Sequence, residues 1–368
     1  MTDPQMKIPL MRPRLPDRQA LASYLAEIDK NRWYSNFGPL ERRFEANLAE
    51  HFGLGERQVI CVANGTQALS ISLKSVARFP VGYCLMPSFT FAATPHAAVS
   101  AGLEPYFLDV DPGTWALDPR KLLSLLPELD APIAAVVPVA PFGAAVDVEA
   151  WDEFQDATGI PVVIDAAAGF DNARCGASPV MISLHATKVM GIGEGGLILC
   201  QDLQIAERVR ASRNFGFMGE RVAEIPGMNA KLSEYGAAVG LAALAEWPET
   251  RLIFLDVARQ YREVFSNVAG VDFAPGFLAD SASSTCNIVL ERPIASHVIE
   301  ALAQDGIETR RWWNLGCHNE PVFAGCRREG LEVTAELGQR VVGLPFYRDL
   351  NIDQIEQVRN SLDRALDR

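Results

Sequence analysis

The chain has 368 residues, of which 49% are hydrophobic and 21% charged, the balance of a globular protein. Because single hydrophobic cores seldom grow beyond about 250–300 residues, we expect a large domain at residues 1–250 and a smaller one at 251–368. The formal net charge of -13 argues against a nucleic-acid partner, since duplex binding depends on clustered lysines and arginines. A small anionic ligand remains compatible, because a local site can be electropositive on an acidic protein.

Targeting and redox signals are weak. The segment at 1–16 has no charged leader followed by an apolar stretch, so we expect no signal peptide. No apolar run approaches the roughly 20 residues that span a bilayer. The seven cysteines are scattered, without C-x-x-C spacing. We therefore expect a cytoplasmic protein with no membrane partner, no disulfide framework and no zinc site.

Between residues 59 and 201, short apolar runs rich in β-branched residues alternate with helix-like stretches. Strands are predicted at 59–63, 83–87, 105–110, 133–139, 161–167, 180–185 and 196–200. Helices are predicted between most of them, including 66–77, 118–126 and 147–158. Apolar runs separated by helices indicate an α/β fold whose mostly parallel, seven-stranded sheet is covered on both faces. The connection between the last two strands is short, which favours their antiparallel pairing.

From about residue 231 the pattern changes. Residues 231–247 and 250–269 are predicted to form two long helices. A smaller mixed region follows at 286–313, and a helix at 353–366 closes the chain. The C-terminal part is therefore predicted to be a smaller α/β domain.

The first polar feature at a strand end is "ANGTQALSIS", where the first strand gives way to a helix at Asn64-Gly65-Thr66. In α/β sheets, ligands bind beyond the carboxyl ends of the strands. Free amides and the helix dipole make this junction a candidate anion site, and Gly65 lets a phosphate approach the backbone. The alternative is an ordinary strand-to-helix turn with Thr66 as N-cap.

Two charged residues follow other strands. Asp165 ends the apolar run "PVVID", where a carboxylate is costly to bury unless it meets a cation or several donors. Its alternative is the N-cap of a short helix. Lys188 follows the strand at 180–185, and a lysine in a semi-apolar cleft can act as nucleophile or base and form Schiff bases. Its alternative is a solvated surface lysine.

Four glycines, Gly191, Gly193, Gly195 and Gly196, stand directly behind Lys188. Their "GIGEGG" pattern superficially suggests a phosphate loop or a dinucleotide fingerprint. Neither fits, because the phosphate loop places its lysine after the glycines and the dinucleotide motif opens a helix. We interpret the glycines as a tight turn that excludes side chains near the lysine.

A phosphate-binding turn, a buried carboxylate and a lysine in a cleft together suit pyridoxal 5'-phosphate (PLP). Lys188 would form a Schiff base with the cofactor, and Asp165 would keep the ring nitrogen protonated. The helix N-terminus at Gly65 would take the phosphate.

Several motifs, in the same order, resemble the sugar aminotransferases of the DegT/DnrJ/StrS type, which are PLP enzymes of fold type I. The resemblance covers almost the whole chain, and its motifs include "GPLERRFEANLAEHFG", "NGTQAL", "MPSFTFAAT", "PYFLDVDPGTWALDP", "VVIDAAAGFD", "SLHATKVMGIGEGG", "RNFG", "GMNAKLSEYGAAVGLAAL" and "GLPFY".

The resemblance implies that Lys188 is the Schiff-base lysine and that Asp165 pairs with the pyridinium. It assigns the remaining cofactor contacts to Gly65, Thr66, Gln67 and Ser183 at the phosphate, Phe91 stacked on the ring, and His185 beside the site. Asn229 would reach the cofactor of a neighbouring subunit, which implies a homodimer with shared active sites. His318 would lie near the substrate.

Some residues are more ambiguous. Arg310 could meet a sugar-nucleotide diphosphate or a substrate carboxylate, although exposed arginines are the commoner case. Asp109 and Asp111 look like a metal pair, but before Pro-Gly they are better interpreted as turn formers, so no metal is expected. Two positions depart from the family: Ala168 replaces its usual glutamine or histidine, and Ala140 replaces another histidine.

The implied activity is a ping-pong transfer of an amino group from an amino acid, L-glutamate, to a nucleotide-linked 3- or 4-keto sugar. One alternative is a PLP-dependent sugar dehydratase or lyase, in which a histidine stands at the lysine position. Another is a non-catalytic sensor or binding protein that keeps the fold, which has no need of an intact lysine–aspartate pair. A nucleotide- or NAD-binding module built on "GIGEGG" is disfavoured by the order of its residues.

Overall fold

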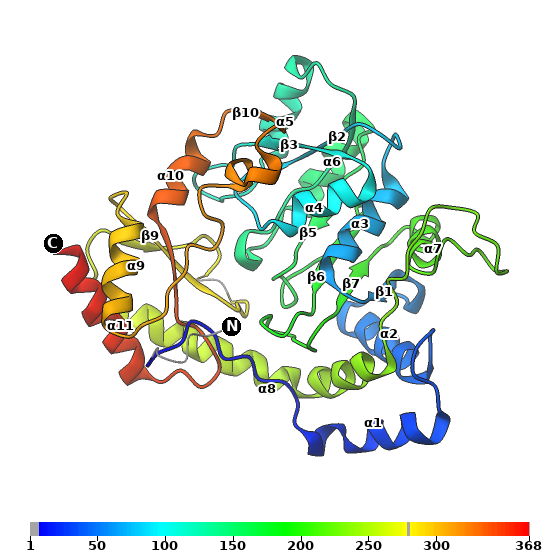
Figure 1. Ribbon diagram of the computed structural model, residues 1–368, viewed down its shortest axis with the longest axis horizontal. Coiled ribbons are helices and arrows are strands. Elements are labelled where there is room, and N and C mark those ends of the chain that lie inside the picture. Colours follow the sequence, from blue (N-terminus) through cyan, green and yellow to red (C-terminus); the bar gives the residue numbers. More distant parts are fainter. Residues whose placement is uncertain (1–6, 278–279, 368) are drawn as a thin grey trace.

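A computed structural model describes residues 7–277 and 280–367, so part of the segment in which no signal peptide is expected lies outside the described residues. Helices pack on both sides of a central sheet (Figure 1). The predicted strands of the sheet are β1 (Val59–Val62), β2 (Tyr83–Pro87), β3 (Glu104–Leu108), β4 (Ile133–Val136), β5 (Ile164–Asp165), β6 (Val180–Ser183) and β7 (Gly196–Leu199).

The sheet is mostly parallel, as predicted. Hydrogen-bonded neighbours follow the orders β1-β7-β6-β5 and β10-β3-β2-β4, and parallel bridges from Val136 to Val162 and from Val139 to Asp165 join the two halves. Within this sheet β7 alone is antiparallel to its neighbours, which confirms the prediction from its short connection to β6. The added edge strand β10 (Arg327–Glu329) comes from the C-terminal third and was not predicted.

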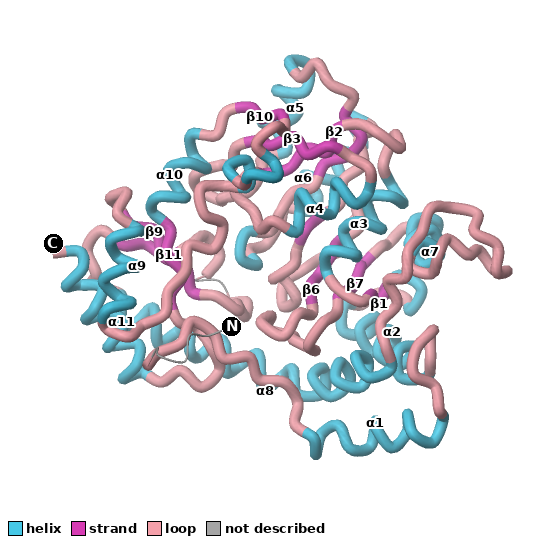
Figure 2. The backbone as a smooth tube through the Cα atoms, in the orientation of Figure 1, coloured by secondary structure: helices cyan, strands magenta, loops and turns pink. Residues whose placement is uncertain are grey.

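In most strands of this sheet, alternate residues face two different helical layers, which Figure 2 shows on either side of the strands. In β1, Val59 and Cys61 join one core cluster with α2, α5, α6 and α8, while Ile60 and Val62 join another with α3, α4 and α7. The helices are α1 (Arg18–Asn31), α2 (Pro39–Phe52), α3 (Gly65–Val76), α4 (Ala93–Ala101), α5 (Pro119–Leu125), α6 (Val148–Thr158), α7 (Leu203–Ser212) and α8 (Glu234–Phe265).

The two long helices predicted around residue 248 are one helix, so that prediction was wrong. α8 runs without a break through Pro248. Proline removes one backbone hydrogen bond and normally ends or bends a helix. Here α8 packs against α1, α2 and α11, and this tertiary packing outweighs the local preference (Figure 1). The predicted domain boundary near residue 250 lies inside α8 and stays a prediction.

The C-terminal part contains a second, antiparallel sheet in the order β11-β9-β8. Its elements are β8 (Val271–Phe273), β9 (Cys286–Leu290), α9 (Ala295–Gln304), α10 (Glu332–Arg340), β11 (Val341–Leu344) and α11 (Ile352–Leu366). Among the described residues, no helix combines the length and the apolar character needed to cross a bilayer.

Candidate active site

The predicted anion site lies at the turn from β1 into α3. The Asn64 side chain, not that of Thr66, caps the helix, and its Oδ1 accepts from the Gln67 amide at 2.9 Å. The extended backbone of Asn64 lets its side chain reach forward over the first turn. The amides of Gly65 and Thr66 have no acceptor within the described chain, as is usual at a helix N-terminus, and remain available to an anion.

Two glycines give this turn its shape. A Cβ added to Gly65 would lie 3.1 Å from the Ser183 Cβ, so the end of β6 stands directly beside the turn. A Cβ on Gly196 would lie 2.8 Å from the Asn64 carbonyl carbon and 2.9 Å from the Gly65 nitrogen. Gly196 therefore lets β7 pack closely against the turn at Asn64-Gly65, a role that the sequence did not reveal.

Lys188 sits at the head of a tight return between β6 and β7, as interpreted from the glycines. The Leu184 amide donates to the Gly195 carbonyl at 2.9 Å, and the Ala186 amide to the Gly193 carbonyl at 2.8 Å. Gly193 has φ +100°, in the left-handed region that favours glycine. The Lys188 amide donates to the His185 carbonyl at 2.8 Å, which places His185 in the same return.

Asp165 is buried at the end of β5 and has two protein donors. Thr94 Oγ1 donates to its Oδ2 at 2.8 Å, and the Ala167 amide to its Oδ1 at 3.1 Å. Burial raises the pKa of Asp165, while these donors and the Lys188 charge oppose the rise. Burial lowers the pKa of Lys188, and Asp165 opposes that shift. The two side chains are therefore close enough to influence each other's charge.

Phe91 is an exposed aromatic residue, with 60% of its surface accessible. It follows β2 and precedes α4, where the Thr94 amide donates to its carbonyl at 3.1 Å. One helical turn therefore carries both the exposed ring and the hydroxyl that binds Asp165.

Comparison with known proteins decides the family. The sequence model of the DegT/DnrJ/EryC1/StrS aminotransferase family matches residues 17–363. The chain belongs to this family. The aminotransferase is 32% identical to protein Mb3436c of Mycobacterium bovis over 98% of its own length and 90% of that protein. It is 27% identical to the dTDP-4-amino-4,6-dideoxy-D-glucose transaminase of Escherichia coli, over 96% of this chain and 98% of that one.

Solved structures agree. The aminotransferase superposes on DesI, crystallised in the presence of its TDP-sugar product, with a TM-score of 0.87 and 30% identity over 100% of this chain and 94% of that one. A further structure with the same fold, at 22% identity, contains the cofactor PMP. Both the enzyme class and the fold predicted from sequence are confirmed: the protein is a PLP-dependent aminotransferase of fold type I.

The residues of the aminotransferase fit PLP. The free amides of Gly65 and Thr66, with the Ser183 hydroxyl nearby, suit a phosphate. The Gln67 Oε1 is buried in the same turn without a hydrogen-bond partner among the described residues. Asp165 offers a buried carboxylate to the ring nitrogen, and the exposed Phe91 ring offers a face for stacking.

Three predicted residues are not joined to this group by any contact within the described chain. Asn229 is exposed, and its backbone forms an isolated antiparallel β-bridge with Asn214. The Arg310 side chain lies 3.6 Å from Glu308 and stacks over Trp312. His318 Nδ1 lies 2.7 Å from the Ser88 Oγ, just beyond β2, and burial lowers the pKa of His318. Their roles stay predictions.

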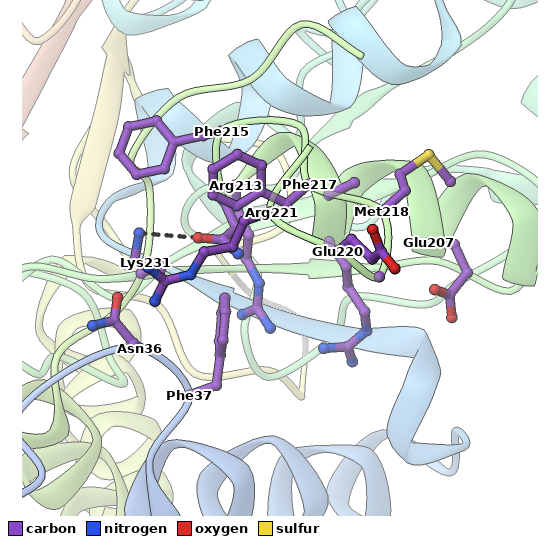
Figure 3. A pocket seen from close by; sticks show the side chains of 14 residues that line it. Asn36, Phe37, Glu207, Arg213, Phe215, Phe217, Met218, Glu220, Arg221 and Lys231 are labelled. Carbon is purple, nitrogen blue, oxygen red and sulfur yellow. Dashed lines mark hydrogen bonds between the residues drawn. The ribbon is translucent and has the colours of Figure 1, made fainter. Parts of the chain in front are cut away.

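A cavity of about 870 Å³ lies elsewhere in the described part of the chain. Figure 3 shows Arg213, Arg221 and Lys231 between the rings of Phe37 and Phe215. Lys231 Nζ donates to Asn214 Oδ1 at 3.3 Å, beside the segment that carries Asn229. This cavity lies next to the segment of Asn229, which is predicted to contact a second subunit. Lys188 is not among the residues that line it.

Two threonines near Asp165, Thr90 and Thr94, were not predicted as site residues. Their spacing, four residues apart just after a strand end, is the sequence signal that could have identified them. Asp111 forms its turn by accepting from the Gly113 amide at 2.9 Å, as predicted. Asp109 instead caps the distant helix α10, accepting from the Val333 and Thr334 amides at 2.8 Å each.

Proposed function

We propose that the aminotransferase transfers an amino group from L-glutamate to a nucleotide-linked keto sugar with its ketone at C3 or C4. The observation that carries this proposal is the half-buried Lys188 close enough to the buried Asp165 for each to shift the other's pKa. The Escherichia coli relative acts as a transaminase of a dTDP-linked sugar, and the DesI structure was obtained with a TDP-sugar product. These relatives support a nucleotide sugar as the acceptor.

Different residues of the chain would serve different steps of the proposed amino transfer. PLP, when bound, supplies a conjugated ring that accepts electrons from the substrate carbon. Asp165 would hold a proton at the ring nitrogen, while Gly65, Thr66 and Ser183 would hold the phosphate. Because burial lowers the pKa of Lys188, more of its amine is neutral and able to attack or to accept a proton. Lys188 would then carry the proton between the reacting carbons.

The test begins with the purified enzyme and added PLP. Borohydride should fix the cofactor to Lys188, located by peptide mass spectrometry. A panel of 3-keto and 4-keto nucleotide sugars with L-glutamate should then yield an amino sugar and 2-oxoglutarate in equal amounts. Failure to take up PLP would overturn the proposal. A deoxygenated product without amino transfer would instead establish the dehydratase alternative.

We also propose that the working unit is a homodimer with shared sites. Asn229 is exposed, and arginines and a lysine line the neighbouring cavity. Both features support contact between this surface and the cofactor phosphate of a second copy of the chain. Two exposed apolar side chains, Phe215 and Met218, line this cavity together with the cations. Exposed apolar side chains gathered at one place are typical of a protein interface.

Subunit complementation tests the shared site. Lys188→Ala and Asn229→Ala should each be impaired alone. A heterodimer of the two has one site with both an intact lysine and an intact asparagine, so unfolding and refolding the mixture should restore activity. If the mixture stays as inactive as its components, Asn229 does not serve the partner's site.

The proposed location is the cytoplasm. All seven cysteines are free, which suits a reducing compartment. Reducing and non-reducing mass analysis of the protein from its native host would detect any disulfide that contradicts this.

A further inference from the structure

Two buried threonines stand in a line behind Asp165. Thr94 Oγ1 lies 2.8 Å from Asp165 Oδ2, and Thr90 Oγ1 lies 2.9 Å from Thr94 Oγ1. A hydroxyl has a single hydrogen, and that of Thr94 is directed at the carboxylate. Thr90 is therefore the donor to Thr94, and the line has one direction, from Thr90 through Thr94 to Asp165. Both threonines are almost fully buried, with 2% and 1% exposed.

The line joins two strands that are not neighbours in the sheet. Thr90 and Thr94 follow β2, Asp165 ends β5, and β4 lies between these strands. Thr94 is held in place because its amide binds the Phe91 carbonyl in the first turn of α4. The residue whose ring is predicted to stack on the cofactor and the residue whose hydroxyl binds Asp165 thus belong to one backbone turn.

The carboxylate depends on these donors. Burial disfavours its charged form, and the Thr94 hydroxyl and the Ala167 amide each bind one of its oxygens. Each carboxylate oxygen keeps further acceptor capacity for a protonated ring nitrogen. A hydroxyl that itself accepts a hydrogen bond is a stronger donor, so Thr90 reinforces Thr94.

We propose that Thr90 and Thr94 are positioning residues that keep Asp165 ionised and aimed at the cofactor's ring nitrogen. This inference rests on the proposed use of PLP at this site. Its consequence is a dependence of cofactor affinity on pH that the two hydroxyls control.

The structure offers a matched control. Thr334 Oγ1 donates to Asp109 Oδ1 at 2.7 Å, and Thr334 is fully buried. Thr334→Val thus removes a bond of the same kind at a carboxylate outside the lysine site. Any general cost of replacing a buried threonine appears in this variant as well.

The experiment measures the dissociation constant of PLP from each cofactor-free variant across a range of pH, by the absorbance of the bound cofactor. Thr94→Val should weaken binding about tenfold near neutral pH. The weakening should grow as pH falls, because Asp165 without its donor takes up a proton at higher pH. Thr94→Ser should bind like the wild type, Thr90→Val should shift in the same direction by less, and Thr334→Val should bind normally.

The outcomes separate the inference from its premise. If Thr94→Val and Thr90→Val match the wild type in affinity and pH profile while Asp165→Asn loses PLP, the positioning role of the two threonines is refuted and the proposed function stands. If the wild type takes up no PLP, the proposed function fails and the inference with it. If Thr94→Val does not fold, Thr90→Val provides the test instead. An unchanged pH profile of PLP binding in Thr90→Val would overturn the positioning role.

Discussion

In the described part of the chain, two largely buried groups that combine opposite charges are built differently. The first, the lysine site, consists of Lys188 and Asp165 at the carboxyl edge of the sheet. The second, the glutamate cluster, joins α2, β1, α8 and the end of α7, and comprises Glu41, Glu45, Glu234, Arg210 and Arg213. Arg213 Nη1 alone donates to Glu41 at 3.0 Å and to Glu45 at 2.8 Å.

The two groups differ in how many hydrogen-bond partners their charged side chains have. In the glutamate cluster every carboxylate has at least two donors: Glu234, for example, accepts from the Leu40 and Glu41 amides at 2.9 and 2.8 Å. In the described part of the chain, the Lys188 amine donates to no protein acceptor, whereas Arg213 donates to two carboxylates even though its Nε has no partner. Buried charge alone therefore does not mark an active site; a lysine without a hydrogen-bonded anion, close to a buried carboxylate, is the better indicator here.

The largest effect should follow from Lys188→Met, which keeps the volume of the side chain and removes the amine. We expect turnover to fall by at least about a thousandfold, because the nucleophile is lost. The free energy of unfolding should change by no more than about 1 kcal/mol, since few contacts depend on the amine. Steady-state rates and urea unfolding of the same preparation test both. Turnover close to that of the wild type would remove Lys188 from the mechanism.

The matched change in the other group is Arg213→Met, and it should act on stability. Removing the guanidinium leaves Glu41 and Glu45 buried without their shared cation, at a cost of about 3–5 kcal/mol. The loss should shrink at acidic pH, where the carboxylates can take up protons. Urea unfolding at acidic and at neutral pH measures both effects. A cost below about 1 kcal/mol would mean that the cluster relaxes or admits water.

Local signals explain what the sequence could predict. The turn at Gly65 and the return at Lys188 are set by neighbouring residues, so their strand and helix boundaries follow from short patterns. The passage of α8 through Pro248, the addition of β10 to the sheet and the capping of α10 by Asp109 depend on packing between distant segments. The contact of Thr94 with Asp165 is of the same kind, since 71 positions separate them.

The smallest effect, Glu41→Gln, probes the cost of charge inside the glutamate cluster. Burial raises the pKa of Glu41 from 4.5 to about 7, while Arg213 opposes the rise. Between those values the native state holds a proton that the unfolded state has released, so this carboxyl makes the protein less stable as pH rises. Glutamine cannot ionise but still offers an acceptor to the Phe37 amide, which Glu41 binds at 3.0 Å. The unfolding free energy of Glu41→Gln, minus that of the wild type, should therefore increase by about 2 kcal/mol as pH rises from 4.5 to 7. A difference that stays constant over this range would show that Arg213 keeps Glu41 ionised throughout, and that the cluster is electrostatically balanced despite its burial.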